Sequence, residues 1–220
     1  MAKFFLHVPK TGGQSFRKAA VQYFGKDNSL LLYGENSKTT TSVINSIYYG
    51  DIYSNHKEKL EAICNIIEQK SISFFSSHAS AIMLPCFKEE NAIIFLREPT
   101  QRIISHYNYA IKKGHITGTF EAFIENPIYQ NMQSTILCGR DIKSIKFIGI
   151  MEFYKDSITL FNKTFNTSLK VYKENRMVFF SKKIKYSKLS EEEKEKIKYL
   201  NQKDYLLYYE ALSLFQNRIK

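Results

Sequence analysis

The chain has 220 residues, of which 44% are hydrophobic, and it carries a formal net charge of +11 at pH 7. This length suits one α/β domain with a sizeable core, so we expect a single domain over residues 1–220. No apolar run approaches the roughly 18 residues of a membrane span, and no secretory leader precedes the first predicted strand, so we expect no transmembrane segment.

The excess of lysine and arginine implies anionic partners. A nucleic acid, an acidic glycan or a cofactor with two phosphates would each suit such a charge. The lysines are scattered along the chain, and no helix-turn-helix, zinc-finger or RNA-stacking motif accompanies them. We therefore expect no nucleic-acid partner.

The three cysteines, Cys64, Cys86 and Cys138, are odd in number and widely spaced. Such a set predicts neither a disulfide framework nor a zinc site. Cys64 lies on an apolar helical face, so we expect it to pack in the core. This cysteine usage is typical of a reducing compartment.

The hydrophobic pattern alternates between strands and helices along the chain. It predicts strands over residues 3–8, 29–33, 72–76, 92–96, 146–150 and 169–172, and helices over 14–24, 57–69, 99–113, 119–125, 128–137, 153–165, 190–200 and 202–217. Two loops are predicted, over residues 34–56 and over the basic segment 174–189. The first is expected either to contribute to the side of a site that binds the acceptor substrate or to be mobile. This alternation favours an α/β fold with a parallel sheet covered by helices on both faces.

The first predicted strand runs into the segment His7-Val8-Pro9-Lys10-Thr11-Gly12-Gly13-Gln14-Ser15, and an amphipathic helix follows. A strand, a glycine-containing turn and a helix together bind phosphate, because glycines let the backbone approach the anion and the first helical N–H groups point at it. Lys10 adds a positive charge there. In nucleoside triphosphate loops the lysine follows the last glycine, whereas Lys10 precedes the glycine pair.

A second motif follows the predicted buried strand 92–96. Arg97 stands at the carboxyl end of that strand, and Pro99 suits the first position of the next helix. Ser105 lies about two turns into this helix. An arginine fork and a hydroxyl together suit a phosphate group.

Both motifs resemble those of sulfotransferases that use 3′-phosphoadenosine 5′-phosphosulfate (PAPS) and release 3′-phosphoadenosine 5′-phosphate (PAP). The resemblance implies a P-loop-kinase-like fold and a PAPS site. It assigns Lys10, Thr11, Gly12, Gly13, Gln14 and Ser15 to the 5′-phosphosulfate and Arg97 and Ser105 to the 3′-phosphate. Gln14 departs from the family pattern, where Thr is usual. Because Arg97 stands where a nucleoside triphosphatase would hold magnesium, we expect no metal requirement.

Three further segments resemble the carbohydrate branch of this family, closest to the heparan-sulfate 2-O-sulfotransferase-like group and its bacterial relatives. They are Asn131-Met132-Gln133-Ser134 followed by Leu137-Cys138-Gly139, Phe147 to Glu152, and Asp204-Tyr205 with Tyr208 and Tyr209. The resemblance implies transfer to a hydroxyl of an anionic or neutral glycan. The Golgi members of the family carry a membrane anchor, whereas we expect no transmembrane segment here. The resemblance therefore implies a bacterial cytoplasmic enzyme, at most peripheral to a membrane.

The general base is predicted to be His78. The segment Ser76-Ser77-His78-Ala79-Ser80 resembles the segment that supplies the base in the 2-O-sulfotransferase group, although the first histidine of the family pair is Ser76 here. A histidine with a pKa near 6.5 suits this role. Lys10 is the predicted electrostatic partner of the leaving phosphate, and His106, Glu98 and Glu152 remain alternative bases.

Other functions stay open at this stage. A protein-tyrosine acceptor is the alternative to a glycan. A P-loop nucleotide or small-molecule kinase would require ATP and magnesium. A catalytically inactive module would bind PAP without turnover.

Overall fold

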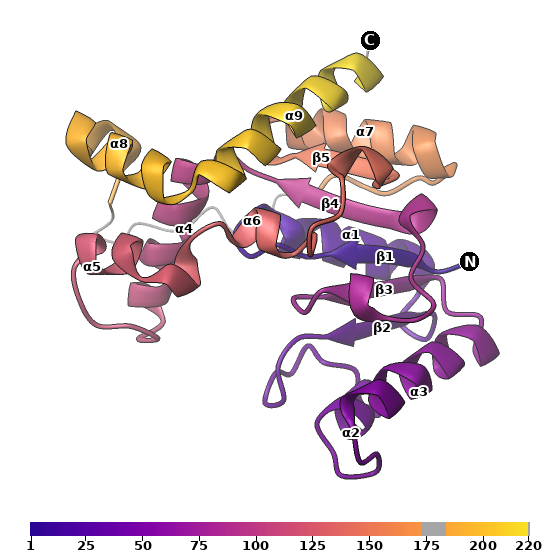
Figure 1. The fold of residues 1–220 in the computed structure, drawn as a ribbon. Helices are drawn as coiled ribbons and strands as arrows, with labels where there is room; N and C mark the ends of the chain where they lie inside the picture. Colours follow the sequence, from indigo (N-terminus) through magenta and orange to yellow (C-terminus); the bar gives the residue numbers. More distant parts are fainter. Residues whose placement is uncertain (173–183, 220) are drawn as a thin grey trace.

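The computed structural model describes residues 1–172 and 184–219. Its centre is a sheet of five parallel strands in the order β2-β3-β1-β4-β5 (Figure 1). The strands are β1 (Lys3–Leu6), β2 (Ser29–Leu32), β3 (Phe74–Ser77), β4 (Ala92–Leu96) and β5 (Phe147–Ile150). The predicted α/β fold with a parallel sheet flanked by helices is confirmed.

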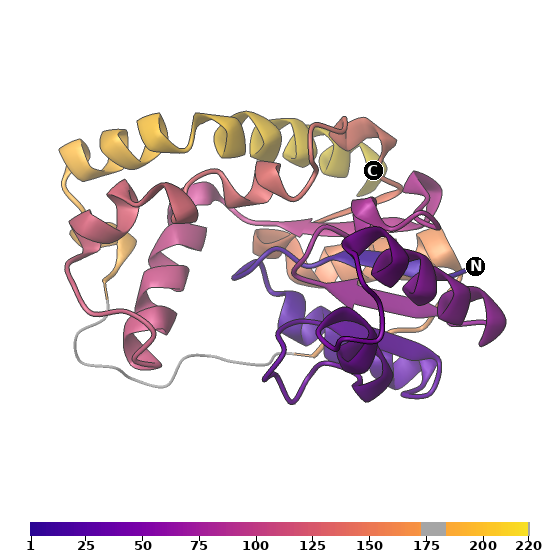
Figure 2. The same ribbon diagram turned by 60° about the horizontal axis from the view of Figure 1, so that its bottom comes forward.

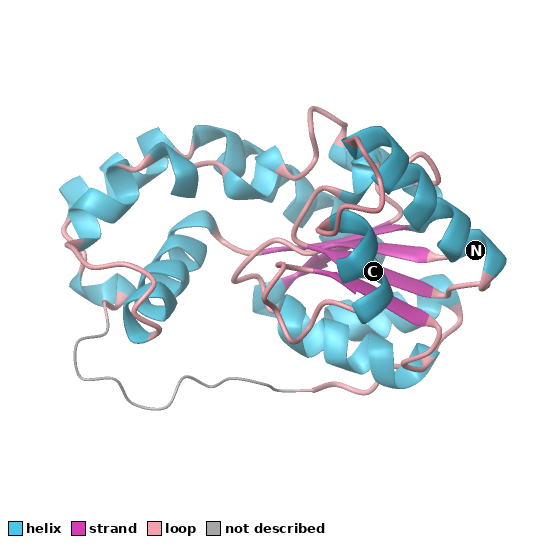
Figure 3. Ribbon diagram, turned by 90° about the horizontal axis from the view of Figure 1, so that it is seen from below, coloured by secondary structure: helices cyan, strands magenta, loops and turns pink. Residues whose placement is uncertain are grey.

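Helices cover both faces of this sheet (Figure 3). On one face, Phe16 of α1 (Gly13–Phe24) packs against Phe5, Phe95 and Phe161, the last from α7 (Tyr154–Phe165). The other face carries α3 (His56–Gln69) and α9 (Gln202–Ile219) (Figure 1). Every residue of β4 is buried, as expected for a strand covered on both sides.

The remaining helices are α2 (Ser42–Tyr48), α4 (Pro99–Lys112), α5 (Phe120–Glu125), α6 (Met132–Thr135) and α8 (Glu191–Leu200). Helices α4, α5 and α8 share a second apolar cluster, which includes Ile103, Phe123 and Ile197. In Figure 2 they lie to the left of the sheet, past the carboxyl ends of the strands. The site residues at those ends therefore face a wall made largely by α4.

Three predictions of secondary structure are wrong in part. Residues 169–172 form no strand, because the backbone N–H and C=O of Leu169 both pair with the side chain of Asn162. The predicted loop 34–56 contains helix α2, whose Ile44 and Ile47 are buried. The predicted helix 128–137 divides into a 3₁₀ turn (Pro127–Tyr129) and α6, since Asn131 between them adopts a left-handed conformation.

The predicted basic loop 174–189 lies largely outside the described residues. Its described end forms a 3₁₀ turn at Tyr186–Lys188. Among the described helices, none is long and apolar enough to cross a membrane.

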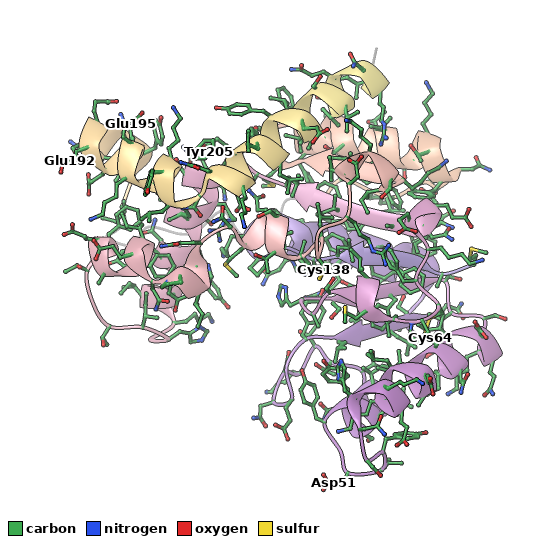
Figure 4. The ribbon with its side chains drawn as sticks, in the orientation of Figure 1. Asp51, Cys64, Cys138, Glu192, Glu195 and Tyr205 are labelled. Carbon is green, nitrogen blue, oxygen red and sulfur yellow. A yellow bond between two sulfur atoms is a disulfide. The ribbon has the colours of Figure 1, made fainter. Side chains whose placement is uncertain are left out.

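Cys64 and Cys86 form a disulfide, so the prediction of no disulfide framework is wrong, whereas Cys64 packs in the core as expected. Cys64 comes from α3 and Cys86 from the segment that precedes β4, and their Cα atoms lie 5.6 Å apart. Cys138 is exposed and lies beside α6, far from Cys64 (Figure 4). Because disulfides persist mainly in oxidising compartments, the cysteines no longer argue for a reducing one.

Reduction of this disulfide should lower the free energy of unfolding by about 3 kcal/mol, because the bond closes a loop of about 22 residues in the unfolded chain. PAP affinity should stay unchanged, since neither cysteine lines the site described below. Urea unfolding and PAP titration, each with and without dithiothreitol, measure the two effects. A loss of PAP affinity on reduction would show that the disulfide supports the site.

Candidate active site

The loop between β1 and α1 is tightly folded. Lys10 (φ 72°) and Gly12 (φ 84°) both adopt left-handed conformations, and the hydroxyl of Thr11 donates to the carbonyl of Val8 at 3.0 Å. A Cβ on Gly12 would come within 2.2 Å of the Met151 sulfur, and one on Gly13 within 2.1 Å of the His7 ring. The glycine pair therefore lets the start of α1 lie directly against its neighbours.

A cavity of about 330 Å³ opens at this loop, at the carboxyl edge of the sheet. All the predicted site residues except Thr11 line it: Lys10, Gly12, Gly13, Gln14, Ser15, His78, Arg97 and Ser105. Thr11 is fully buried and serves the turn instead. His106, an alternative base in the sequence analysis, also lines the cavity, together with His7, Pro9 and Met151 of the quoted motifs. Tyr109 lines it too, and the sequence analysis did not indicate this residue.

Arg97 is held from its backbone. Its N–H donates to the Gln133 side-chain oxygen at 2.9 Å, and the Gln133 amide donates to the Arg97 carbonyl at 2.9 Å. The guanidinium donates to the Lys10 carbonyl at 3.3 Å. Gln133 therefore holds the backbone of Arg97 in place, and the Arg97 side chain extends toward the phosphate-type loop, the segment Lys10–Ser15 that follows β1 and runs into α1.

Gln133 is itself anchored by Asp204 at the start of α9. The two carboxylate oxygens accept from the backbone N–H groups of Gln133 at 3.1 Å and Ser134 at 2.8 Å. Asp204 is fully buried, and the guanidinium of Arg102 lies 4.0 Å away. The Asn131–Ser134 and Asp204 segments thus meet in space and position Arg97, and in this structure they carry no information about an acceptor.

Glu98 and Glu152 are both engaged outside the cavity. Glu98 caps α4 by accepting from the N–H groups of Thr100 and Gln101, and it also accepts from the Tyr205 hydroxyl at 3.0 Å. Figure 4 shows Tyr205 near the start of α9. Glu152 accepts from the N–H of Glu98 and, at 3.2 Å, from the hydroxyl of Tyr208. This network leaves His78 better placed than either carboxylate to act as a base.

His78 has a defined tautomer. Its Nδ1 lies 2.7 Å from the carbonyl oxygen of His7, and because a carbonyl can only accept, Nδ1 carries the hydrogen. In the neutral ring Nε2 then holds a free lone pair. The pKa of His78 is lowered, first by partial burial of the ring, although the residue keeps an exposed surface; the His7 hydrogen bond opposes this shift, and Arg17 adds to it.

Residues 4–210 match the family model described as the sulfotransferase family. The chain belongs to this family. No curated protein matches the sequence. The matched region of this sulfotransferase includes the loop Lys10–Ser15, the pair Arg97 and Ser105, and the His78 segment.

Two aromatic residues support His78 in this sulfotransferase. The His7 ring centroid lies 4.4 Å from that of His78, and the Tyr33 ring meets His78 edge-on at 4.6 Å. The Tyr33 hydroxyl is 2.7 Å from His7 Nδ1 and 2.5 Å from the Ser76 hydroxyl. Ser76, which the resemblance places at the first histidine of the family pair, thus connects to His78 through Tyr33 and His7.

His106 is a poor base in the same cavity. Its pKa is lowered to about 3, first by burial and then by the charges of Arg102 and Lys10, with smaller effects of His78 and His115. The ring packs edge-on against Phe123 and Tyr129. His106 is therefore neutral at physiological pH and fills the wall of the cavity.

Among the described residues, no cluster of histidine, cysteine and carboxylate side chains could hold a metal ion.

Lys10 lies in a strongly cationic setting. Its ammonium group stands 4.0 Å from the centre of the Tyr109 ring. Burial and the charge of Arg97 lower its pKa to about 8. An anion placed between Lys10 and Arg97 would relieve this repulsion, so the sulfotransferase cavity is built for negative charge.

PAP binding should therefore weaken as the pH rises through about 8, since the free protein then loses the Lys10 charge that a bound anion would keep. Below pH 8 Lys10 is charged before binding, and the full affinity is present. Calorimetry from pH 7 to 9.5, in buffers of different ionisation enthalpy, should detect proton uptake near pH 8. The matched variant Lys10→Met should bind more weakly and without this uptake, whereas a flat wild-type affinity would contradict the assignment.

Proposed function

We propose that this sulfotransferase moves a sulfuryl group from PAPS to a hydroxyl of a glycan, with His78 as the general base. One observation carries the proposal: the phosphate-type loop, the Arg97–Ser105 pair and a histidine with a free Nε2 all line one cavity. Each supplies a different requirement of the reaction, and the fold brings them together from three strand ends.

The residues at the cavity suit the donor. The PAPS molecule would supply the activated sulfuryl group. The backbone from Thr11 to Ser15 and the Lys10 ammonium would hold its 5′-phosphosulfate, because N–H groups at the start of a helix bind phosphate. Arg97 and Ser105 would hold its 3′-phosphate, as an arginine fork and a hydroxyl can.

His78 would take the proton of the acceptor hydroxyl at Nε2. The hydrogen bond from Nδ1 to the His7 carbonyl keeps the ring in the correct tautomer and stabilises the imidazolium that forms. The lowered pKa keeps the ring neutral, and so ready to accept a proton, at physiological pH. Lys10 would stabilise the negative charge that develops on the leaving phosphate.

A glycan acceptor is supported by the His78 segment, which resembles the carbohydrate branch of the family. We further propose a bacterial surface glycan that is sulfated in the cytoplasm before export. Function in that compartment requires the site to survive without the Cys64–Cys86 disulfide, which the reduction experiment above examines.

The decisive experiment supplies labelled PAPS together with acidic oligosaccharides, neutral oligosaccharides and tyrosine-containing peptides in competition. Label on an oligosaccharide is the expected result. Label on peptide tyrosine alone would refute the glycan proposal and retain sulfuryl transfer. PAP binding without label on any acceptor would favour an inactive binding module, and phosphate transfer from ATP with magnesium would favour a kinase.

A further inference from the structure

The strand order arranges the site residues along the carboxyl edge of the sheet. Across the sheet, β4, β1, β3 and β2 are successive neighbours. Arg97 follows β4, Lys10 follows β1, His78 follows β3, and β2 ends at Leu32. If the proposed function holds, the donor phosphates occupy the β4 and β1 positions and the base stands at β3. The acceptor must then extend toward the β2 side, away from the donor.

A second cavity, of about 170 Å³, lies on that side. Its walls are largely apolar and come from β2, α2, α3, β3 and the turn after β3. They include Leu32, Leu60, Phe75, Met83 and Leu84, and Tyr48 and His56 add polar atoms. Ser77 and Ala79, the two neighbours of His78, line this cavity, whereas His78 lines the first one. The two cavities therefore meet at the proposed base.

A buried hydroxyl without a partner belongs to this second cavity. Side chains alternate along β3, so Ser77 shares a face with Phe75, and both line the cavity. Ser77 is fully buried, and its hydroxyl has no hydrogen-bond partner among the described residues. By contrast, Ser80 in the same wall donates to the Ile136 carbonyl at 2.7 Å. A buried hydroxyl left unpaired is destabilising, so a ligand that pairs with it gains affinity.

We propose that this cavity is an acceptor subsite for the acetamido group of a 2-acetamido sugar. The methyl group would lie on the apolar walls, and the carbonyl oxygen would accept from the Ser77 hydroxyl. A carboxylate or sulfate suits the cavity less well, because the described residues that line it include no lysine or arginine and a single histidine, His56. A sugar hydroxyl would place a polar group against the apolar walls.

The test compares chitotetraose with cellotetraose, β1,4-linked glucose tetramers that differ in bearing a 2-acetamido or a 2-hydroxyl group. Each is titrated into the PAP-bound protein and followed by saturation-transfer NMR. We expect tighter binding of chitotetraose and the strongest saturation at its acetamido methyl protons. Equal binding of the two tetramers, or saturation spread evenly along chitotetraose, would overturn the proposal.

Two serine variants separate a ligand contact from a structural role. Ser77→Ala should weaken chitotetraose binding about three- to tenfold, the value of one neutral hydrogen bond, while leaving cellotetraose and PAP affinity unchanged. It should not lower the melting temperature of the free protein, because the hydroxyl it removes is unpaired there. Ser80→Ala, the matched control, should keep the preference for chitotetraose. An unchanged preference in Ser77→Ala would overturn the proposal.

The proposed transfer reaction is judged separately by labelled PAPS. Chitotetraose binding that depends on Ser77, without label on any glycan, would refute the transfer proposal and retain the acetamido subsite. Glycan labelling that depends neither on the acetamido group nor on Ser77 would refute the acetamido subsite and retain the transfer proposal.

Discussion

Replacing His78 by alanine should lower kcat by about 10²–10⁴-fold and leave PAP affinity nearly unchanged. The side chain would act only on the acceptor proton, so its loss removes an interaction of the transition state and none of donor binding. Steady-state kinetics with labelled PAPS and PAP calorimetry measure the two quantities. Added imidazole should restore part of the turnover of His78→Ala.

The pH profile gives an independent check. Because the pKa of His78 is lowered from 6.5, wild-type kcat/KM should rise with pH through a limb that lies below 6.5, level off, and fall again near pH 8 as Lys10 loses its charge. His78→Ala should lack the rising limb. His106→Asn, in the same cavity, should keep it, since a group with a pKa of about 3 does not titrate there. Near-full activity in His78→Ala would place the base elsewhere.

Arg97→Ala should abolish most of the preference for PAP over adenosine 5′-phosphate. The wild-type protein should bind PAP at least tenfold more tightly, because a hydrogen bond to a charged group contributes about 1.5–3 kcal/mol and the competitor lacks the 3′-phosphate. Calorimetric titration of both nucleotides into both proteins tests this directly. Equal wild-type affinities would refute the 3′-phosphate assignment.

Two companion variants show how Arg97 acts. Ser105→Ala should reduce the preference for PAP to a smaller extent, since it removes one neutral group from the same cavity. Gln133→Ala keeps the guanidinium but removes the two hydrogen bonds that hold the Arg97 backbone. It should therefore weaken PAP binding less than Arg97→Ala does, and a larger loss would show that positioning by Gln133 matters more than the charge.

Local patterns in the sequence predicted much of the fold. The apolar run 92–96 is β4, and Pro99 begins α4 as expected. The capping box of Ser190 and Glu193 opens α8. Such features depend on neighbouring residues alone, because backbone propensity, capping and burial periodicity act within a few positions of the chain. The same locality made both phosphate-type motifs readable, each being a strand end followed by a helix.

The partners of the site side chains were decided by tertiary structure. His78 pairs with a carbonyl 71 residues away, and His7 with a hydroxyl 26 residues away. The disulfide likewise joins two cysteines that only the packing of α3 against the segment before β4 brings together. The sequence by itself therefore determined the α/β fold and most of the residues that line the cavity, though not Tyr109. Only packing between distant segments decided that Asp204 and Gln133 support Arg97, and that Tyr33 and His7 support His78.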